Sequence, residues 1–109
     1  MSNKSLSELT AQVKKVMHRY QQDFPDVQVD RDYYPFKMTE EWGECLQAYL
    51  MYTGRGRKKG LSDEEIRTEF EKEFADVLGF LLLFADSEGI DIEKALDDKW
   101  LTRLKSEIE

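Results

Sequence analysis

Two short acidic motifs in this sequence have the composition of a metal-binding site. The first contains Glu41 and Glu44, the second contains Glu73 and Asp76, and the two acids of each pair are three positions apart. Residues at this spacing in an α-helix lie on one face, about one turn apart. Hard divalent cations prefer oxygen ligands of this kind. The motifs therefore predict a Mg²⁺ site, with Mn²⁺ as an alternative ion, rather than a zinc site.

The spacing between the motifs predicts that the two pairs meet. Glu44 precedes Gly54 by ten residues, and Glu73 follows Ser62 by eleven. If two helices fold back on each other at the glycine-containing segment 54–60, each pair lies roughly 15 Å from the turn, at about 1.5 Å per residue. We therefore expect the pairs to face each other across one gap between antiparallel helices.

The neighbours of the acids predict that the carboxylates are at least partly buried. On a helical wheel each pair continues an apolar stripe, formed by Cys45, Ala48 and Tyr52 for the first pair and by Val77, Phe80 and Phe84 for the second. Four carboxylates on such faces cannot all stay ionised without a counter-charge, because desolvation and mutual repulsion both oppose it. A divalent cation supplies that charge, and Mg²⁺ typically takes water and substrate phosphates as further ligands.

The two motifs resemble those of a known family. The pattern E-x-x-E, a gap of 28 residues, then E-x-x-D is similar to that of the MazG-like all-α nucleoside triphosphate pyrophosphohydrolases. The flanking segments Glu40–Ala48 and Glu73–Asp91 resemble the family too, and the likeness covers roughly residues 36–105. Relatives in this family include dimeric dUTPases, dCTP pyrophosphatases and phosphoribosyl-ATP pyrophosphohydrolase.

The resemblance implies an all-α, four-helix MazG-like bundle completed by homo-oligomerisation, as a homodimer or a dimer of dimers. The activity it implies is hydrolysis of a nucleoside triphosphate to the monophosphate and pyrophosphate, with Mg²⁺ held by Glu41, Glu44, Glu73 and Asp76. Glu40 points about 100° away from its neighbour, and we assign it to orient or deprotonate the attacking water. Two alternatives remain, namely phosphoribosyl-ATP as substrate and a non-catalytic dimeric helical binding module.

Basic side chains outside the motifs are candidates for phosphate binding. Four cations lie within five residues of the loop between the motifs, and arginine can bind phosphate oxygens bidentately. In the last predicted helix the family shows a lysine followed by an asparagine and a basic residue, but Thr102-Arg103 here replaces the asparagine signature. The candidates are Arg55, Arg57, Lys58, Lys99 and Arg103. The alternative is that these cations belong to a solvated turn and to a helix surface.

Aromatic residues before the first motif are candidates for binding a nucleobase. Tyr34 and Phe36 lie in or next to segment 24–34, which contains Pro25 and three aspartates and is predicted to be a loop. Aromatic rings stack on any base, so the base and the sugar are not predicted. The alternative is that these rings pack the loop onto the core.

Composition restricts the class of partner and the compartment. The 109 residues predict one domain, and 23 acidic against 16 basic residues give a net charge of -7, which argues against binding nucleic acid or an anionic membrane. The most apolar run, Val77–Ala85, is nine residues long, about half of a membrane span. One cysteine and no apolar signal region indicate a cytoplasmic protein.

Helix signals predict four helices that hold the two motifs. Capping-box patterns begin at Ser5 and Ser62, and Gly54 and Gly89 follow predicted helix ends. The expected helices span about 5–23, 36–53, 62–87 and 91–108. The third is apolar nearly all round and needs neighbours on every side. In so short a chain, we expect a second subunit to be one of them.

Overall fold

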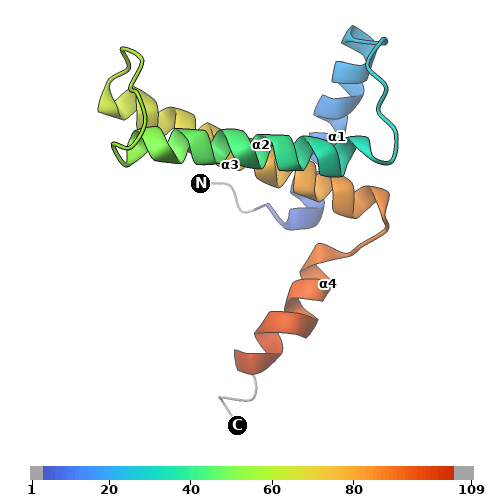
Figure 1. Cartoon of the computed structure of the whole chain (residues 1–109). Helices are drawn as coiled ribbons and strands as arrows, with labels where there is room; N and C mark the ends of the chain where they lie inside the picture. Colours follow the sequence, from blue (N-terminus) through green and yellow to red (C-terminus); the bar gives the residue numbers. More distant parts are fainter. Residues whose placement is uncertain (1–3, 105–109) are drawn as a thin grey trace. The chain divides into compact units, whose positions relative to one another are not determined.

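The computed structural model describes residues 4–104. Helices are the only regular secondary structure in this range, and it contains no strand. Four helices follow one another along the chain: α1 (Leu6–Asp23), α2 (Tyr33–Tyr52), α3 (Asp63–Ser87) and α4 (Ile92–Leu96), which continues into a π-helical turn, η1 (Asp97–Leu101) (Figure 1). The prediction of an all-α chain with four helices is confirmed. Residues 105 to 109, and with them the predicted end of the last helix, lie outside the described residues.

The chain divides into two compact units. The hairpin unit, Gln28–Leu81, contains α2, the loop after it and most of α3. The other unit contains α1, the end of α3 from Leu82 and α4 with η1. Both acidic motifs belong to the hairpin unit. No helix among the described residues is long and apolar enough to cross a membrane.

The predicted capping boxes set the starts of α1 and α3. The Ser62 hydroxyl accepts a hydrogen bond from the Glu65 backbone N–H at 3.1 Å, and the Glu65 carboxylate accepts one from the Ser62 N–H at 2.9 Å. Ser5 and Glu8 make the same reciprocal pair at the start of α1. Each box satisfies two backbone donors that a helix start would otherwise leave unpaired.

Glycines end α2 and α3 where the sequence predicts. Gly54 has φ 77° and Gly89 has φ 69°, in the left-handed region that glycine adopts without a steric penalty. The Arg55 N–H donates back to the Leu50 carbonyl at 2.8 Å, and the Ile90 N–H donates to the Ala85 carbonyl at 2.8 Å. These bonds satisfy carbonyls that the helix ends would leave free.

Helix α2 begins earlier than predicted. It starts at Tyr33, so Tyr34 lies in its first turn and not in the preceding loop. The Asp30 carboxylate accepts hydrogen bonds from the N–H groups of Asp32 and Tyr33, both at 3.1 Å, and so supplies a start signal outside the helix. Pro35 is tolerated here because first-turn N–H groups have no partner within the helix.

The π-helical turn in α4 is a feature that the sequence analysis missed. The Thr102 N–H donates to the Asp97 carbonyl, five residues back. Apolar residues of this segment recur every four positions, at Ile92, Leu96, Trp100 and Leu104. Because an α-helix repeats every ~3.6 residues, such a row drifts around it. A π-turn takes more residues per turn and reduces the drift.

Candidate metal centre

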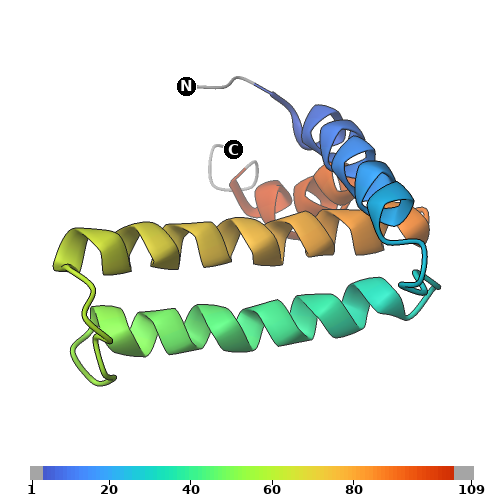
Figure 2. The same cartoon turned by 90° about the horizontal axis from the view of Figure 1, so that it is seen from above.

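The two helices of the hairpin unit lie antiparallel and side by side, with the glycine-containing loop at one end (Figure 2). Ring contacts set their register: Tyr33 meets Phe80 with centroids 6.3 Å apart, and Tyr49 meets Phe70 at 5.7 Å. Between these two contacts, Cys45 is buried on α2. The register therefore brings the middle of α2 level with the middle of α3, where the acidic motifs lie.

The carboxylates of the two motifs converge in this register. One oxygen each from Glu41, Glu73 and Asp76 lie within 4.8 Å of one another, and so do oxygens of Glu40, Glu41 and Glu44. Glu41 belongs to both groups and joins the acids of α2 to those of α3. Glu41 of α2 thus lies beside Glu73 and Asp76 of α3, as expected. Glu44, in contrast, is grouped only with acids of its own helix, and both Glu44 and Asp76 are exposed.

Two of these carboxylates have unsatisfied oxygens. The Glu41 side chain is only 12% exposed, and Oε2 of Glu41 and Oε2 of Glu73 are buried without a hydrogen-bond partner. A buried polar atom without a partner costs free energy, more so if it is charged. A hard cation between the helices would satisfy both oxygens, so the residues present fit Mg²⁺ or Mn²⁺.

The electrostatics of the cluster favour a bound proton while no cation is present. Burial raises the pKa of Glu41 from 4.5 to about 7, with further increases from a hydrogen bond with Glu44 and from the charges of Glu44 and Asp76, while Lys37 lowers the pKa. Burial also raises the pKa of Glu73, followed by repulsion from Asp76 and Glu44. A cation that binds here must displace this proton.

Lys37 is a residue of the cluster that the sequence analysis missed. Its Nζ lies 2.9 Å from Oε1 of Glu40 and 3.8 Å from Oε1 of Glu41. It also lies 5.9 Å from the centroid of the Phe80 ring on α3. Its position four residues before Glu41, the spacing of a helical ion pair, is the signal that could have identified it.

Glu40 lies closer to the metal candidates than a helical wheel suggests. On the helical wheel the side chain of Glu40 leaves α2 about 100° away from that of Glu41. Even so, a carboxylate oxygen of Glu40 lies within 4.8 Å of oxygens of Glu41 and Glu44. Its side chain is 58% exposed and is bound by Lys37. Glu40 is therefore accessible to water beside the cluster, and its proposed role in activating water stays a prediction.

Basic side chains of the loop between α2 and α3, residues 53–62, contact neighbouring residues of the hairpin unit. Arg55 stacks its guanidinium 5.5 Å from the Tyr49 ring centroid and donates from Nε to Thr53 at 3.1 Å. Lys58 pairs with Asp63 at 3.0 Å, and Arg57 is exposed. Within the described residues no ion pair joins this loop to the four acids, so phosphate binding by the loop stays a prediction.

The other predicted contact residues lie on two different elements. Lys99 belongs to η1 and Arg103 follows it, and both are exposed residues of the unit that contains α1. Tyr34 is half-buried with its ring 5.8 Å from that of Tyr33, whereas Phe36 is 70% exposed. These residues lie on α2 ahead of the acids, and their binding to a base also stays a prediction.

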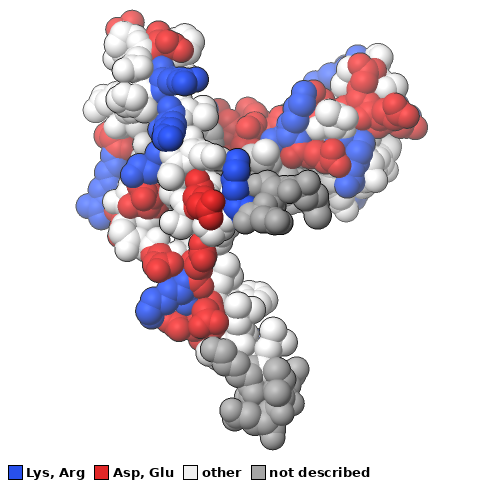
Figure 3. Space-filling model, turned by 180° about the vertical axis from the view of Figure 1, so that it is seen from behind, with Lys and Arg blue, Asp and Glu red and all other residues white. Residues whose placement is uncertain are grey.

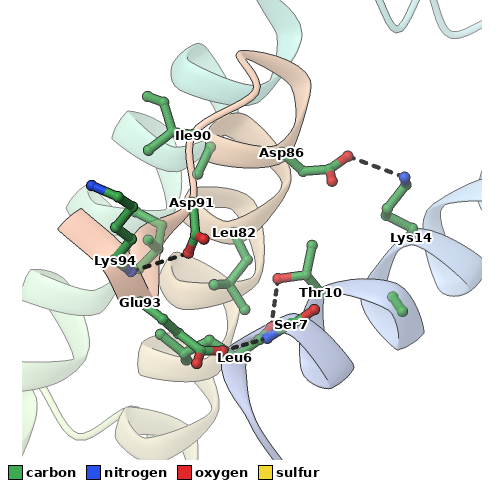
Figure 4. A pocket seen from close by; sticks show the side chains of 13 residues that line it. Leu6, Ser7, Thr10, Lys14, Leu82, Asp86, Ile90, Asp91, Glu93 and Lys94 are labelled. Atoms are coloured by element: carbon green, nitrogen blue, oxygen red, sulfur yellow. Dashed lines mark hydrogen bonds and ion pairs between the residues drawn. The ribbon is translucent and has the colours of Figure 1, made fainter. Parts of the chain in front are cut away.

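A cavity outside the hairpin unit has polar groups that are already paired. It has a volume of about 450 Å³ and is lined by α1, the end of α3 and the start of α4 (Figure 4). Lys14 pairs with Asp86 at 3.1 Å, and the Glu93 carboxylate accepts the Ser7 N–H at 3.0 Å. Asp91 caps α4 through the Lys94 N–H. Because these groups satisfy one another, the cavity offers little for a ligand.

Surface charge and comparisons with known proteins provide no other assignment. On the face in Figure 3, Lys and Arg side chains of the described residues are interspersed with Asp and Glu. No family model, curated protein or solved structure matches the chain. A function is therefore argued from the acidic cluster and from the resemblance of its two motifs.

Proposed function

We propose that the chain is a Mg²⁺-dependent nucleoside triphosphate pyrophosphohydrolase of MazG-like type. The observation that supports this most strongly is the convergence of acids from α2 and α3, with two buried carboxylate oxygens that have no partner. A purely structural role explains these groups poorly, because acids within apolar stripes lower stability. Mn²⁺ could replace Mg²⁺, since both take oxygen ligands.

In this proposal Glu41, Glu44, Glu73 and Asp76 hold one or more ions between the helices. A bound ion supplies positive charge that offsets the negative charge of the triphosphate. Glu40, exposed beside the cluster, orients a water molecule and accepts its proton. The water oxygen attacks phosphorus, the bond to the leaving oxygen breaks, and the products are the nucleoside monophosphate and pyrophosphate.

The remaining contacts follow the sequence-based assignment. Arg55, Arg57 and Lys58 of the loop, with Lys99 and Arg103, are the proposed phosphate ligands, and Tyr34 and Phe36 are the proposed base contacts. Since Arg55 and Lys58 are engaged locally, binding requires them to exchange those partners for phosphate oxygens. The substrate is a deoxynucleotide, a ribonucleotide or a modified nucleotide, because stacking alone does not discriminate between bases or sugars.

The test is release of pyrophosphate from a panel of nucleotides with Mg²⁺ or Mn²⁺, comparing the wild type with Glu44→Gln. We expect turnover in the wild type and a loss of at least about 100-fold in Glu44→Gln, because a neutral amide is a poor ligand for a hard cation. Glu71→Gln is the matched control, since Glu71 lies on α3 in an exposed pair with Arg67. Equal turnover in Glu44→Gln and wild type would refute the site.

Two alternatives are separated by the same panel. Phosphoribosyl-ATP as the preferred substrate would keep the metal site and change only the specificity. A non-catalytic binding module predicts no pyrophosphate release from any nucleotide and no stabilisation by Mg²⁺.

We also propose that the chain forms a homodimer or a dimer of dimers through an uncharged flank of the hairpin unit. The flank consists of one row on α2 (Trp42, Leu46, Tyr49) and one on α3 (Phe74, Leu78, Leu81). Each of these side chains is between 39% and 53% exposed. Both rows lie one position after the inward-facing row of their helix, so in an antiparallel pair they lie on the same side.

The extent of this flank suits a subunit interface. After Glu44, α2 carries no charged residue up to its end at Tyr52. If the six side chains lost their remaining exposure, roughly 500 Å² would be buried per protomer, taking about 150–250 Å² for a large side chain. Two protomers would bury roughly 1,000 Å², the lower limit for a specific interface.

We further propose a cytoplasmic location, since Cys45 is an unpaired, buried thiol.

A further inference from the structure

Lys37 is a cation within an otherwise acidic cluster. Its ammonium contacts Oε1 of Glu40 at 2.9 Å and Oε1 of Glu41 at 3.8 Å, and its side chain is 28% exposed. Among the described residues, no other ion pair reaches Glu40, Glu41, Glu44, Glu73 or Asp76. Lys37 is thus the group that now partly neutralises the acids.

A divalent cation and this ammonium cannot both stay close to Glu41. Glu41 belongs to both groups of candidate ligands, so an ion bound by either group lies beside the carboxylate that Lys37 approaches. The positive charges of the ion and of the Lys37 ammonium would repel each other at this short range, even where water screens them in part. The lysine stem is flexible, so the ammonium can leave Glu41 without a change in α2.

The surroundings limit where the displaced ammonium can go. Phe80 on α3 lies on one side of it, with the ring centroid 5.9 Å from Nζ, and the acids lie on another. A triphosphate held by the ion would bring the nearest new negative charge, because Mg²⁺ retains substrate phosphates among its ligands. A lysine ammonium binds phosphate as a compact point charge.

We propose that Lys37 is the resident counter-charge of the acidic cluster and that it transfers from Glu41 to a non-bridging phosphate oxygen of the substrate when a divalent cation binds. This inference rests on the proposed function and adds a substrate-binding residue to it. It assigns the lysine two opposite effects, since the ammonium opposes binding of the ion and favours binding of the triphosphate.

The experiment measures both effects in Lys37→Met without requiring turnover. Binding of Mn²⁺ alone is followed by electron paramagnetic resonance, and binding of inorganic triphosphate in saturating Mg²⁺ is followed by calorimetry. We expect Mn²⁺ to bind about three- to fivefold more tightly, the effect of one partly screened charge. Triphosphate should bind at least about threefold more weakly, since one charge-assisted contact is lost.

Two control variants identify the source of the effect. Lys37→Arg keeps the charge and should bind Mn²⁺ within about twofold of the wild type. Lys94→Met removes a lysine paired with Asp98 outside the hairpin unit and should change neither affinity. General destabilisation of the site would weaken both ligands, so the opposite signs are specific to the proposed exchange.

Several results would overturn the inference. Unchanged or weaker Mn²⁺ binding in Lys37→Met would show that the ammonium does not compete with the ion. Unchanged triphosphate binding would show that the lysine only neutralises Glu40 and Glu41. The proposed function fails separately, by absence of pyrophosphate release from the wild type, because neither binding measurement depends on hydrolysis.

Discussion

The raised pKa of a half-buried glutamate on α2 makes the stability of the metal-free protein depend on pH. The pKa of Glu41 in the folded chain is about 7, above its ordinary value of 4.5. Between these pH values the folded state binds more protons than the unfolded state, so stability falls as the pH rises. The difference corresponds to at most about 3 kcal/mol.

We predict that the free energy of unfolding without metal falls by up to about 3 kcal/mol between pH 5 and pH 8. Glu41→Gln should remove most of this dependence, because an amide does not ionise. Urea unfolding monitored by circular dichroism at both pH values measures the change, with Glu71→Gln as the control. Mg²⁺ at pH 8 should restore stability to the wild type. A pH dependence that is equal in Glu41→Gln and the wild type would contradict the assignment.

At the scale of single residues, the grouping of the acids was predictable, whereas the contact of Lys37 with them was not. Glu41, Glu44, Glu73 and Asp76 have a spacing that places each pair on one helix face. Lys37 has an ordinary helical spacing from Glu41, but many lysines on helix surfaces share this spacing, so only the three-dimensional structure distinguishes Lys37. The raised pKa of Glu41 follows mainly from burial, which the sequence predicts only in part.

At the scale of elements, local hydrogen bonds set the boundaries that position the acids. The Ser62 capping box begins α3, eleven residues before Glu73. Hydrogen bonds from the Ser62 backbone N–H and from the Ser62 side chain hold the pKa of the Glu65 carboxyl below its usual value. Signals of this kind act over three or four residues, which is why the starts of α1 and α3 and the turns at Gly54 and Gly89 were predicted correctly.

The boundaries that were not predicted depend on less common local geometry. The early start of α2 depends on the Asp30 carboxylate, which is two and three residues from the N–H groups it accepts. The π-turn of α4 follows no strong sequence signal, although the four-residue spacing of apolar residues agrees with it. Neither feature moves the acids, so the register of the hairpin was still predicted.

We predict that Ser62→Ala lowers the free energy of unfolding by about 1 kcal/mol, because the Glu65 N–H at the start of α3 loses its partner, the Ser62 hydroxyl. Chemical unfolding with urea measures the change. Thr68→Ala, at an exposed position on the same helix, is the control and should be neutral or slightly stabilising. A cost for Thr68→Ala as large as that for Ser62→Ala would show that the cap is not responsible.

At the scale of the whole molecule, two sides of the hairpin unit differ in charge. The net charge is -7, yet the six flank residues between Trp42 and Leu81 are uncharged. Glu44 and Asp76 lie one position before the inward-facing row of their helix, whereas the flank residues lie one position after it. The exposed acids of the cluster therefore lie on the side of the helix pair opposite to the flank. Self-association through the flank would therefore leave the acids accessible to substrate.

We predict that the wild type is dimeric or larger at micromolar concentration and that Leu46→Glu weakens association at least about 100-fold, because it buries an unpaired charge in the interface. Sedimentation velocity over a concentration series measures this. Thr68→Glu, which adds the same charge on the charged end of α3, should leave assembly unchanged. A wild type that stays monomeric throughout would show that the flank is not an interface between copies of the chain.

The two tryptophans are divided between the two compact units. Trp42 lies on α2 and is 46% exposed, while Trp100 lies in η1 and is 65% exposed. Replacing either one with phenylalanine leaves a single tryptophan, whose fluorescence belongs to one half of the chain. The intrinsic emission of this protein can therefore show whether its halves melt together or in sequence, without an attached dye.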